Sequence, residues 1–220
     1  DHRDLHYPLR RQRQMCIRDR FMASAHDHKR AFDQDQGPNT GGMGAISPAP
    51  YLDDALCDQV MTEIVEPLAR GMADEGMPYR GVIYVGLMLT TAEPKVVEFN
   101  CRFGDPEAQV ILPRLKTDLV TAMLAVVEGG PDYFSMRWDE RSAVTVVMAA
   151  KGYPGPYSKG SEIHSLKEAG LHKDILIFHA GTMIDRDENV RATGGRVLTV
   201  TGLGADGASA RQTAYDAIGC

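Results

Sequence analysis

The sequence lacks the features that mark several classes of protein. Its four cysteines, Cys16, Cys57, Cys101 and Cys220, show no Cys-x-x-Cys spacing, which argues against a zinc knuckle or a redox pair. No run of about 18 consecutive apolar residues occurs and no secretory h-region opens the chain. We therefore expect free thiols, no disulfides, no membrane span and a soluble protein of the reducing cytoplasm.

Basic residues are also fewer than acidic ones. The 220 residues carry 24 Lys and Arg against 30 Asp and Glu, a formal net charge of −6. This balance argues against nucleic acid and against anionic membranes as partners, although a local basic pocket is compatible with it. The 43% apolar content is that of a core-forming chain, long enough for one large domain or two small ones. The expected partners are small molecules.

Residues 1–20 differ from the rest of the chain. They contain six Arg and three Asp, few aliphatic residues and no hydrophobic periodicity. A basic targeting arm is one interpretation, but the acidic residues and the absence of a first Met weaken it. Residues 14–20 also look like translated sequencing adapter. We expect residues 1–20 to lie outside the family fold, as a disordered or artefactual start joined to a truncated gene.

Hydrophobic periodicity predicts helices and strands in the first half of the chain. Residues 51–75 repeat apolar positions at helical spacing, and Pro67 lies inside this pattern. A helix with a kink or break near Val65 or Glu66 is therefore expected, because proline removes a donor and clashes with the preceding turn. Residues 82–90 and 95–103 are typical of two strands that form a hairpin.

The pattern of apolar and turn residues changes in the second half of the chain. Two helices are predicted at residues 106–112 and 118–128, the second with Thr117 as its N-cap. From about Ser142, short apolar runs alternate with Gly and Asp turns, which is typical of a mostly β lobe. The pattern of residues 208–218 predicts a last helix, the closing helix of the chain. Helices and strands together indicate an α+β fold.

One predicted strand carries a pattern with chemical meaning. Its side chains alternate between two faces, so an apolar stripe would face the core and a polar stripe would lie opposite. The apolar stripe is Val97, Phe99, Cys101 and Phe103, and the polar stripe is Glu98, Asn100 and Arg102. Carboxylate and amide oxygens suit a hard cation, and a guanidinium grips the phosphate that such a cation carries. The alternative is an ordinary surface ion pair between Glu98 and Arg102.

A glycine-rich loop is the second candidate site. Four glycines fall within residues 37–44 and mark backbone that turns sharply or is closely approached. Such a loop exposes peptide N–H groups that can form an anion-binding nest, and charged residues at 27–30 would complement a phosphate or carboxylate. A plain flexible loop is the alternative. No Gly-Lys-Ser/Thr follows, so this is not a Walker loop.

Several long motifs, taken together and in this order, resemble the phosphoribosylamine-glycine ligase family of ATP-grasp enzymes. They are residues 27–30, 37–45, 79–82, 86–88, 97–107 and 152–155. The resemblance runs from about Phe21 to Ile218. It implies that an ATP-grasp catalytic lobe, an antiparallel sheet with helices at residues 21–141, precedes a small, mostly β C-terminal domain at residues 142–220.

The resemblance also implies an activity and its residues. A ligase of purine biosynthesis would join glycine to 5-phosphoribosylamine by way of glycyl phosphate, with ATP as cosubstrate and Mg²⁺ or Mn²⁺ as cofactor. Glu98 and Asn100 match metal ligands, and Arg102 and Asp105 match catalytic positions, with Arg102 steadying charge on the transferred phosphoryl group. The positions that match substrate-binding segments are Asp27, His28, Lys29, Arg30, Gly37, Pro38, Asn39, Thr40, Gly41, Gly42, Met43 and Gly44.

The resemblance has one large gap. The family's N-terminal domain and the lid that supplies much of the adenine pocket have no counterpart in this sequence. We therefore expect the isolated chain to be inactive. Two alternatives stay open: another ATP-grasp ligase that joins a carboxylate to an amine, or a non-catalytic phosphate-binding module whose Glu98 face has no metal affinity.

Overall fold

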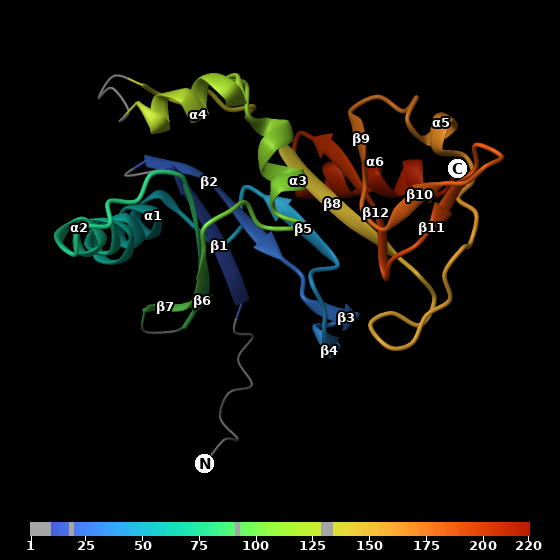
Figure 1. Ribbon diagram of the computed structural model, residues 1–220, viewed down its shortest axis with the longest axis horizontal. Helices are drawn as coiled ribbons and strands as arrows, with labels where there is room; N and C mark the ends of the chain where they lie inside the picture. The colour runs from blue at the N-terminus through green and yellow to red at the C-terminus, as the bar shows by residue number, and fades with distance from the viewer. Residues whose placement is uncertain (1–9, 18–19, 91–92, 129–133) are drawn as a thin grey trace, which may run out of the picture. The chain divides into compact units, whose positions relative to one another are not determined.

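The computed structural model describes residues 10–17, 20–90, 93–128 and 134–220, which group into two compact units (Figure 1). Unit 1 comprises residues up to His26 together with Pro48–Gly104 and Leu115–Asp139. Unit 2 comprises Asp27–Ser47, Asp105–Arg114 and Glu140–Cys220. Both units combine helices with antiparallel strands, which confirms the predicted α+β class. The predicted division at residue 142 follows chain order, whereas unit 2 also takes in two earlier stretches.

The strands of unit 1 follow the order β7-β6-β1-β2, and all neighbours are antiparallel. They are β1 (Arg10–Ile17), β2 (Arg20–Asp27), β6 (Val82–Leu89) and β7 (Pro94–Asn100). Strand β1 lies within residues 1–20, the stretch that we expected to be a disordered or artefactual start outside the family fold. Its backbone pairs with both β2 and β6, whose edges would otherwise lack partners, and this pairing requires no apolar periodicity. Residues 1–9 and 18–19 lie outside the described residues.

A helix in three parts packs against this sheet. It consists of α1 (Asp54–Val60), the π-helical turn η1 (Met61–Val65) and α2 (Glu66–Asp74). The π-helical turn ends at Val65, two residues before Pro67, so the regular helix is interrupted where the kink or break was predicted. The core of unit 1 forms where the helix meets β6, and its buried members are Val60, Val65, Ile83, Val85 and Leu87.

Strand β7 differs from the prediction in its length and its burial. It ends at Asn100, and the predicted core stripe is wrong because Val97 and Phe99 are 49% and 44% exposed. Two features explain this. The strand lies at the edge of the unit 1 sheet, and its register against β6 shifts at Val97, which interrupts the alternation of faces.

Helix α4 (Leu119–Val127) also belongs to unit 1. Its N-cap is Asp118 rather than the predicted Thr117, because the Asp118 carboxylate accepts a hydrogen bond from the Thr121 N–H at 2.8 Å. The Thr117 hydroxyl instead accepts one from the Arg137 N–H at 2.8 Å. Among the described residues, no helix has the length and apolarity that crossing a bilayer requires.

The strands of unit 2 follow the order β5-β8-β12-β9 and are antiparallel. They are β5 (Gly44–Ser47), β8 (Ser142–Ala149), β12 (Arg196–Gly204) and β9 (Ile175–His179). Helix α6 (Gly207–Ile218), the predicted closing helix, packs on β8 and β12 (Figure 1). Gly202 permits this approach, because a Cβ there would collide with the Ala210 carbonyl oxygen.

Short elements complete unit 2. They are the hairpin of β3 (Arg30–Phe32) and β4 (Gln36–Asn39), the hairpin of β10 (Thr182–Ile184) and β11 (Val190–Ala192), α3 (Ala108–Ile111) with the 3₁₀ turn η2 (Leu112–Arg114), and α5 (Leu166–Ala169). Two buried apolar clusters stabilise the unit. One contains Ala169, Val200 and Ala217, and the other Ala192, Val197 and Leu198.

Candidate functional site

The predicted metal ligands lie on β7 in unit 1. Glu98 and Asn100 are two residues apart beyond the register shift, so their side chains share one strand face, as predicted. Glu98 is exposed and Asn100 is half-buried. Glu98 pairs with Gly86 of β6, where an added Cβ would lie 2.9 Å from the Glu98 Cγ. The glycine therefore leaves room for the Glu98 side chain to lie across β6.

The donor set of this pair fits a hard cation. A carboxylate and an amide contribute oxygen atoms, which Mg²⁺ and Mn²⁺ accept as ligands. Within the described residues, no group of three or more His, Cys, Asp or Glu side chains is placed to hold a metal. Glu98 and Asn100 would thus supply only part of a coordination shell, and the rest would come from phosphate oxygens and water.

Arg102 lies beyond the end of β7, whereas the strand was predicted to continue to Phe103 and to carry Arg102. It follows the end of β7, is exposed, and its Nη1 donates a hydrogen bond to the Phe103 carbonyl at 2.8 Å. Where the ladder stops, the Tyr79 hydroxyl donates to the Val82 carbonyl at 3.0 Å. Burial and a hydrogen bond with the Cys101 thiol raise the pKa of Tyr79, so this hydroxyl stays protonated at neutral pH.

The predicted substrate residues come together in unit 2. Residues 27–30 run beside the glycine-rich segment, where the Met43 N–H donates to the His28 carbonyl at 2.8 Å and the His28 N–H to the Gly44 carbonyl at 2.9 Å. The Arg30 Nη1 donates to the Gly37 carbonyl at 2.7 Å. Pro38 and Asn39 are exposed on β4.

The N–H groups of this segment are not exposed as an anion-binding nest, which corrects the sequence-based expectation. Four successive N–H groups, those of residues 40–43, already donate hydrogen bonds within unit 2. Their acceptors are the Lys29 carbonyl (2.8 Å), the Tyr153 hydroxyl (3.3 Å), the Thr40 hydroxyl (3.0 Å) and the His28 carbonyl (2.8 Å). Pairing with residues 28–29 consumes two of them. An anion at this place would therefore be bound by side chains.

Charge in this cluster comes mainly from three side chains. The Asp27 carboxylate is buried, and its Oδ2 lies 3.8 Å from the Lys29 Nζ. Arg30 is exposed. His28 keeps an exposed surface, yet the loss of water around its ring lowers its pKa, an effect that Asp35 partly opposes. At neutral pH the positive charge of residues 27–30 therefore comes from Lys29 and Arg30.

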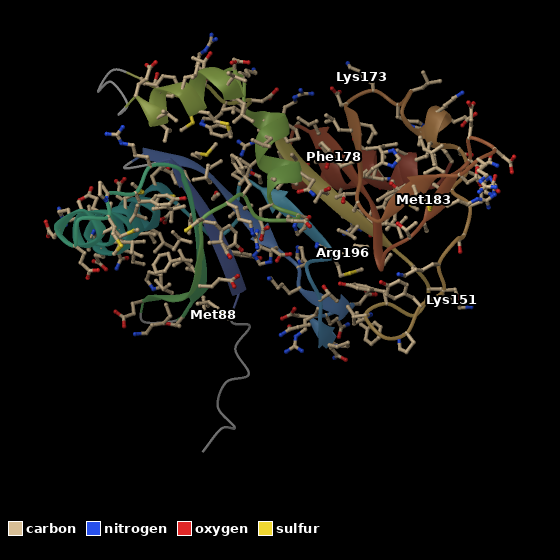
Figure 2. All side chains as sticks on the ribbon, viewed as in Figure 1. Met88, Lys151, Lys173, Phe178, Met183 and Arg196 are labelled. Atoms are coloured by element: carbon tan, nitrogen blue, oxygen red, sulfur yellow. The ribbon has the colours of Figure 1, made fainter. Side chains whose placement is uncertain are left out.

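Arg196, at the start of β12, contacts two predicted residues of the candidate site, and sequence reasoning missed it. Figure 2 labels its side chain, and its Nη1 donates to the Gly41 carbonyl at 2.9 Å. Its Nη2 donates to the Asp105 carboxylate at 2.7 Å. Asp105 thus joins the substrate cluster of unit 2. The sequence separation of 155 residues between Arg196 and Gly41 left only one signal, a Gly-Gly-Arg run before an apolar strand.

Comparison with known proteins defines the class first. Residues 17–108 match the ATP-grasp (A) domain of phosphoribosylglycinamide synthetase, and residues 143–220 match the C domain of the same protein. The biotin carboxylase domain of a thermophilic 2-oxoglutarate carboxylase shares the fold, with a TM-score of 0.66 at 12% identity over 96% of this chain and 46% of that chain. The protein is therefore of the ATP-grasp class.

The particular family follows from closer relatives. The crystal structure of phosphoribosylamine-glycine ligase from Thermotoga maritima has a TM-score of 0.76 at 34% identity, over 96% of this chain and 51% of that chain. The Escherichia coli O157:H7 ligase of that name is 52% identical over 195 residues, which are 88% of this chain and 45% of the relative. The chloroplastic ligase of Arabidopsis thaliana is 51% identical over 200 residues, 90% of this chain and 38% of the relative.

The chain belongs to the phosphoribosylglycinamide synthetase family. It spans less than half the length of these two curated relatives.

Proposed function

We propose that this chain is part of a phosphoribosylamine-glycine ligase of purine biosynthesis. The whole enzyme would use ATP to join glycine to 5-phosphoribosylamine, giving glycinamide ribonucleotide, ADP and phosphate. The observation that supports this most directly is the 52% identity, over 195 residues, to the Escherichia coli O157:H7 protein of that name. The matches to both the A and C domain models support it independently.

The proposed reaction has two steps. In the first, a glycine carboxylate oxygen attacks the γ-phosphorus of ATP, which forms glycyl phosphate and releases ADP. In the second, the amine of 5-phosphoribosylamine attacks the acyl carbon, expels inorganic phosphate and loses a proton. Negative charge shifts among phosphate oxygens in the first step and develops on the acyl oxygen in the second. Cationic groups placed at those oxygens would lower both barriers.

Glu98 and Asn100 would hold Mg²⁺ or Mn²⁺ on the open face of β7. When bound, the metal would neutralise and align phosphate oxygens of ATP. Arg102 has an exposed guanidinium close behind the strand in sequence, and it would carry part of the charge of the transferred phosphoryl group. These roles need exposed polar side chains, and the side chains of Glu98 and Arg102 are exposed.

Lys29 and Arg30 would bind the carboxylate or phosphate of a substrate, and the buried Asp27 would attract an amine. The glycine-rich segment would shape the same part of the site, because its glycines allow close approach of neighbouring groups. Asp105 would orient a reacting group from the place where Arg196 and Gln109 hold its carboxylate.

We further infer that the 220-residue chain does not turn over alone. ATP-grasp sites exclude water from an acyl phosphate by closing two lobes over the nucleotide, and this chain spans 38% and 45% of the two relatives described above. The resemblance places the N-terminal and lid domains in the remainder. We also propose a cytoplasmic location, which the free thiols of Cys57, Cys101 and Cys220 support.

A chimeric enzyme tests the ligase proposal. In the Escherichia coli relative, the segment matching this chain would be replaced by the chain's own residues 21–220, and ADP release would be measured with each substrate omitted in turn. We expect release that requires both glycine and 5-phosphoribosylamine. A chimera that melts like the parent but releases no glycine-dependent ADP would contradict the proposal. Activity with another carboxylate or amine instead would favour a different ATP-grasp ligase, and metal-independent phosphate binding would favour a non-catalytic module.

A further inference from the structure

Arg196 connects two segments of unit 2 that the proposed function assigns to one site. We propose that Arg196 is a positioning residue, which holds the Asp105 carboxylate and the Gly41 and Gly42 peptides in a single arrangement for substrate binding. This inference rests on the proposed function for its catalytic consequence, but not for its structural one. Arg196 itself needs no contact with substrate.

The guanidinium divides its donors between the two segments. Its Nη2 donates to the Asp105 Oδ2 at 2.7 Å, while its Nη1 donates to the Gly41 carbonyl at 2.9 Å and the Gly42 carbonyl at 3.4 Å. A planar fork fixes the angle between these bonds, which a lysine ammonium would not. The second carboxylate oxygen, Asp105 Oδ1, accepts from the Gln109 Nε2 at 2.9 Å. Both oxygens of Asp105 are therefore directed by neighbours.

The glycines fit between these groups only because they lack side chains. A Cβ on Gly41 would lie 2.9 Å from the Arg196 Cζ, so the guanidinium packs against that residue. Gly42 has a φ of +112°, and a Cβ there would collide with the Pro106 ring and lie 2.9 Å from the Asp27 Oδ1. Arg196 on one side and Pro106 with Asp27 on the other thus confine the two peptides.

The role of this contact is orientation more than stability. The Arg196 and Asp105 side chains are 24% and 51% exposed, and ion pairs with that much solvent contribute little to the free energy of folding. Removing the guanidinium should therefore leave the unit folded while Asp105 and the peptides of residues 41–42 become mobile. A merely structural arginine would give the opposite pattern, a lower melting temperature with an unchanged segment.

Hydrogen-deuterium exchange on the 220-residue chain tests the structural part without any activity. In Arg196→Gln, we expect exchange of the peptide covering residues 37–45 to rise about fivefold or more, because local opening becomes easier. Asp105→Asn should raise it too, and the double variant should add little to either single one. The matched control is Arg191→Gln, which loses contacts to Asp185 at 2.7 Å and Glu162 at 2.9 Å in the same unit and should leave that peptide unchanged.

The chimeric enzyme tests the catalytic part. In Arg196→Gln, we expect the KM for glycine or 5-phosphoribosylamine to rise about tenfold or more, with a smaller loss in kcat, since misplaced binding groups weaken substrate capture. Arg196→Lys should recover only part of this, because it keeps a cation for Asp105 but loses the fork. If Arg196→Gln does not fold, the same exchange measurement on Arg196→Lys decides the matter.

The outcomes separate this inference from the proposed function. An inactive but folded wild-type chimera would count against the ligase proposal, while the exchange of residues 37–45 would still judge Arg196. Unchanged exchange in both Arg196 variants would overturn the positioning role. Raised exchange with unaltered KM values in an active chimera would overturn its catalytic consequence.

Discussion

The side chain of Glu98 on β7 lies across Gly86 of β6, where a Cβ would stand 2.9 Å from the Glu98 Cγ. The two residues are also direct partners in the strand ladder. The register of the hairpin therefore decides which residue lies beneath the Glu98 carboxylate, and a glycine at that place gives the carboxylate its room. Strand pairing and the proposed metal site are linked through this one contact.

Gly86→Ala should disturb the metal site more than the fold. The new methyl group would push the Glu98 side chain aside, so we expect the Mg²⁺ concentration for half-maximal activity of the chimera to rise by about 10-fold, as it does when groups supporting a metal ligand are changed. Gly71→Ala is the matched control, since a Cβ on Gly71 meets nothing within 4 Å. That variant should gain about 0.5–1 kcal/mol of stability with unchanged Mg²⁺ dependence.

Glu98→Gln and Asn100→Ala should cost activity without unfolding the protein. Exposed or half-exposed polar side chains carry little packing energy, so the free energy of unfolding should change by no more than about 1 kcal/mol. Turnover of the chimera should fall by about 100-fold or more, because phosphate charge would lose its neutralising metal. Steady-state rates and urea unfolding of each variant measure the two effects. Full activity in Glu98→Gln would remove Glu98 from the proposed ligand set.

Leu87→Ala should destabilise the protein more than Phe99→Ala, although phenylalanine has the larger side chain. Leu87 is 1% exposed in the unit 1 core, and its truncation should cost about 2–5 kcal/mol. Phe99 is 44% exposed on β7, so its truncation should cost well below the roughly 3–5 kcal/mol of a buried phenylalanine. Urea unfolding of the 220-residue chain measures both. A larger loss for Phe99→Ala would mean that the predicted core stripe exists in solution.

Local chemistry made much of unit 1 predictable. The helical repeat of residues 51–75 predicted the helix, and Pro67 predicted a kink or break near Val65 or Glu66, where the structure has a π-helical turn, because proline acts on its own turn. The faces of β7 were less predictable. Alternation assumes an unbroken ladder with one buried face, whereas the register shift at Val97 and the edge position of β7 leave Val97 and Phe99 half exposed.

In the candidate site too, features set by neighbouring residues could be predicted, whereas contacts between distant residues could not. Glu98 and Asn100 could be paired from the sequence, since two residues along a strand share a face. The sequence could not predict that the N–H groups of the loop donate hydrogen bonds within unit 2, because these bonds depend on pairing with residues 28–29 and on the Tyr153 hydroxyl. Arg196 reaches Gly41 across 155 residues, a contact that only the folding of unit 2 creates.

The N-cap of α6 predicts a specific pH dependence. The Asp206 carboxylate accepts hydrogen bonds from the Ser209 N–H and hydroxyl, which lower the pKa of Asp206 in the folded chain. Its contribution to stability is therefore complete above the ordinary pKa of 3.8 and is lost as the pH falls through the lowered, folded value. Asp206→Asn keeps a good N-cap acceptor but cannot titrate.

The measurement is the difference in unfolding free energy between the native chain and Asp206→Asn, taken by urea unfolding from about pH 7 to pH 3. Asp118 and Asp185 also have lowered pKa values, through hydrogen bonds from Thr121 and Arg191, but they are common to both chains and cancel in the difference. We expect the difference to stay constant down to about pH 4.5 and then to shift against the native chain. A difference that does not vary over this range would mean that the Ser209 hydrogen bonds give the Asp206 carboxylate no advantage over an amide at this helix end.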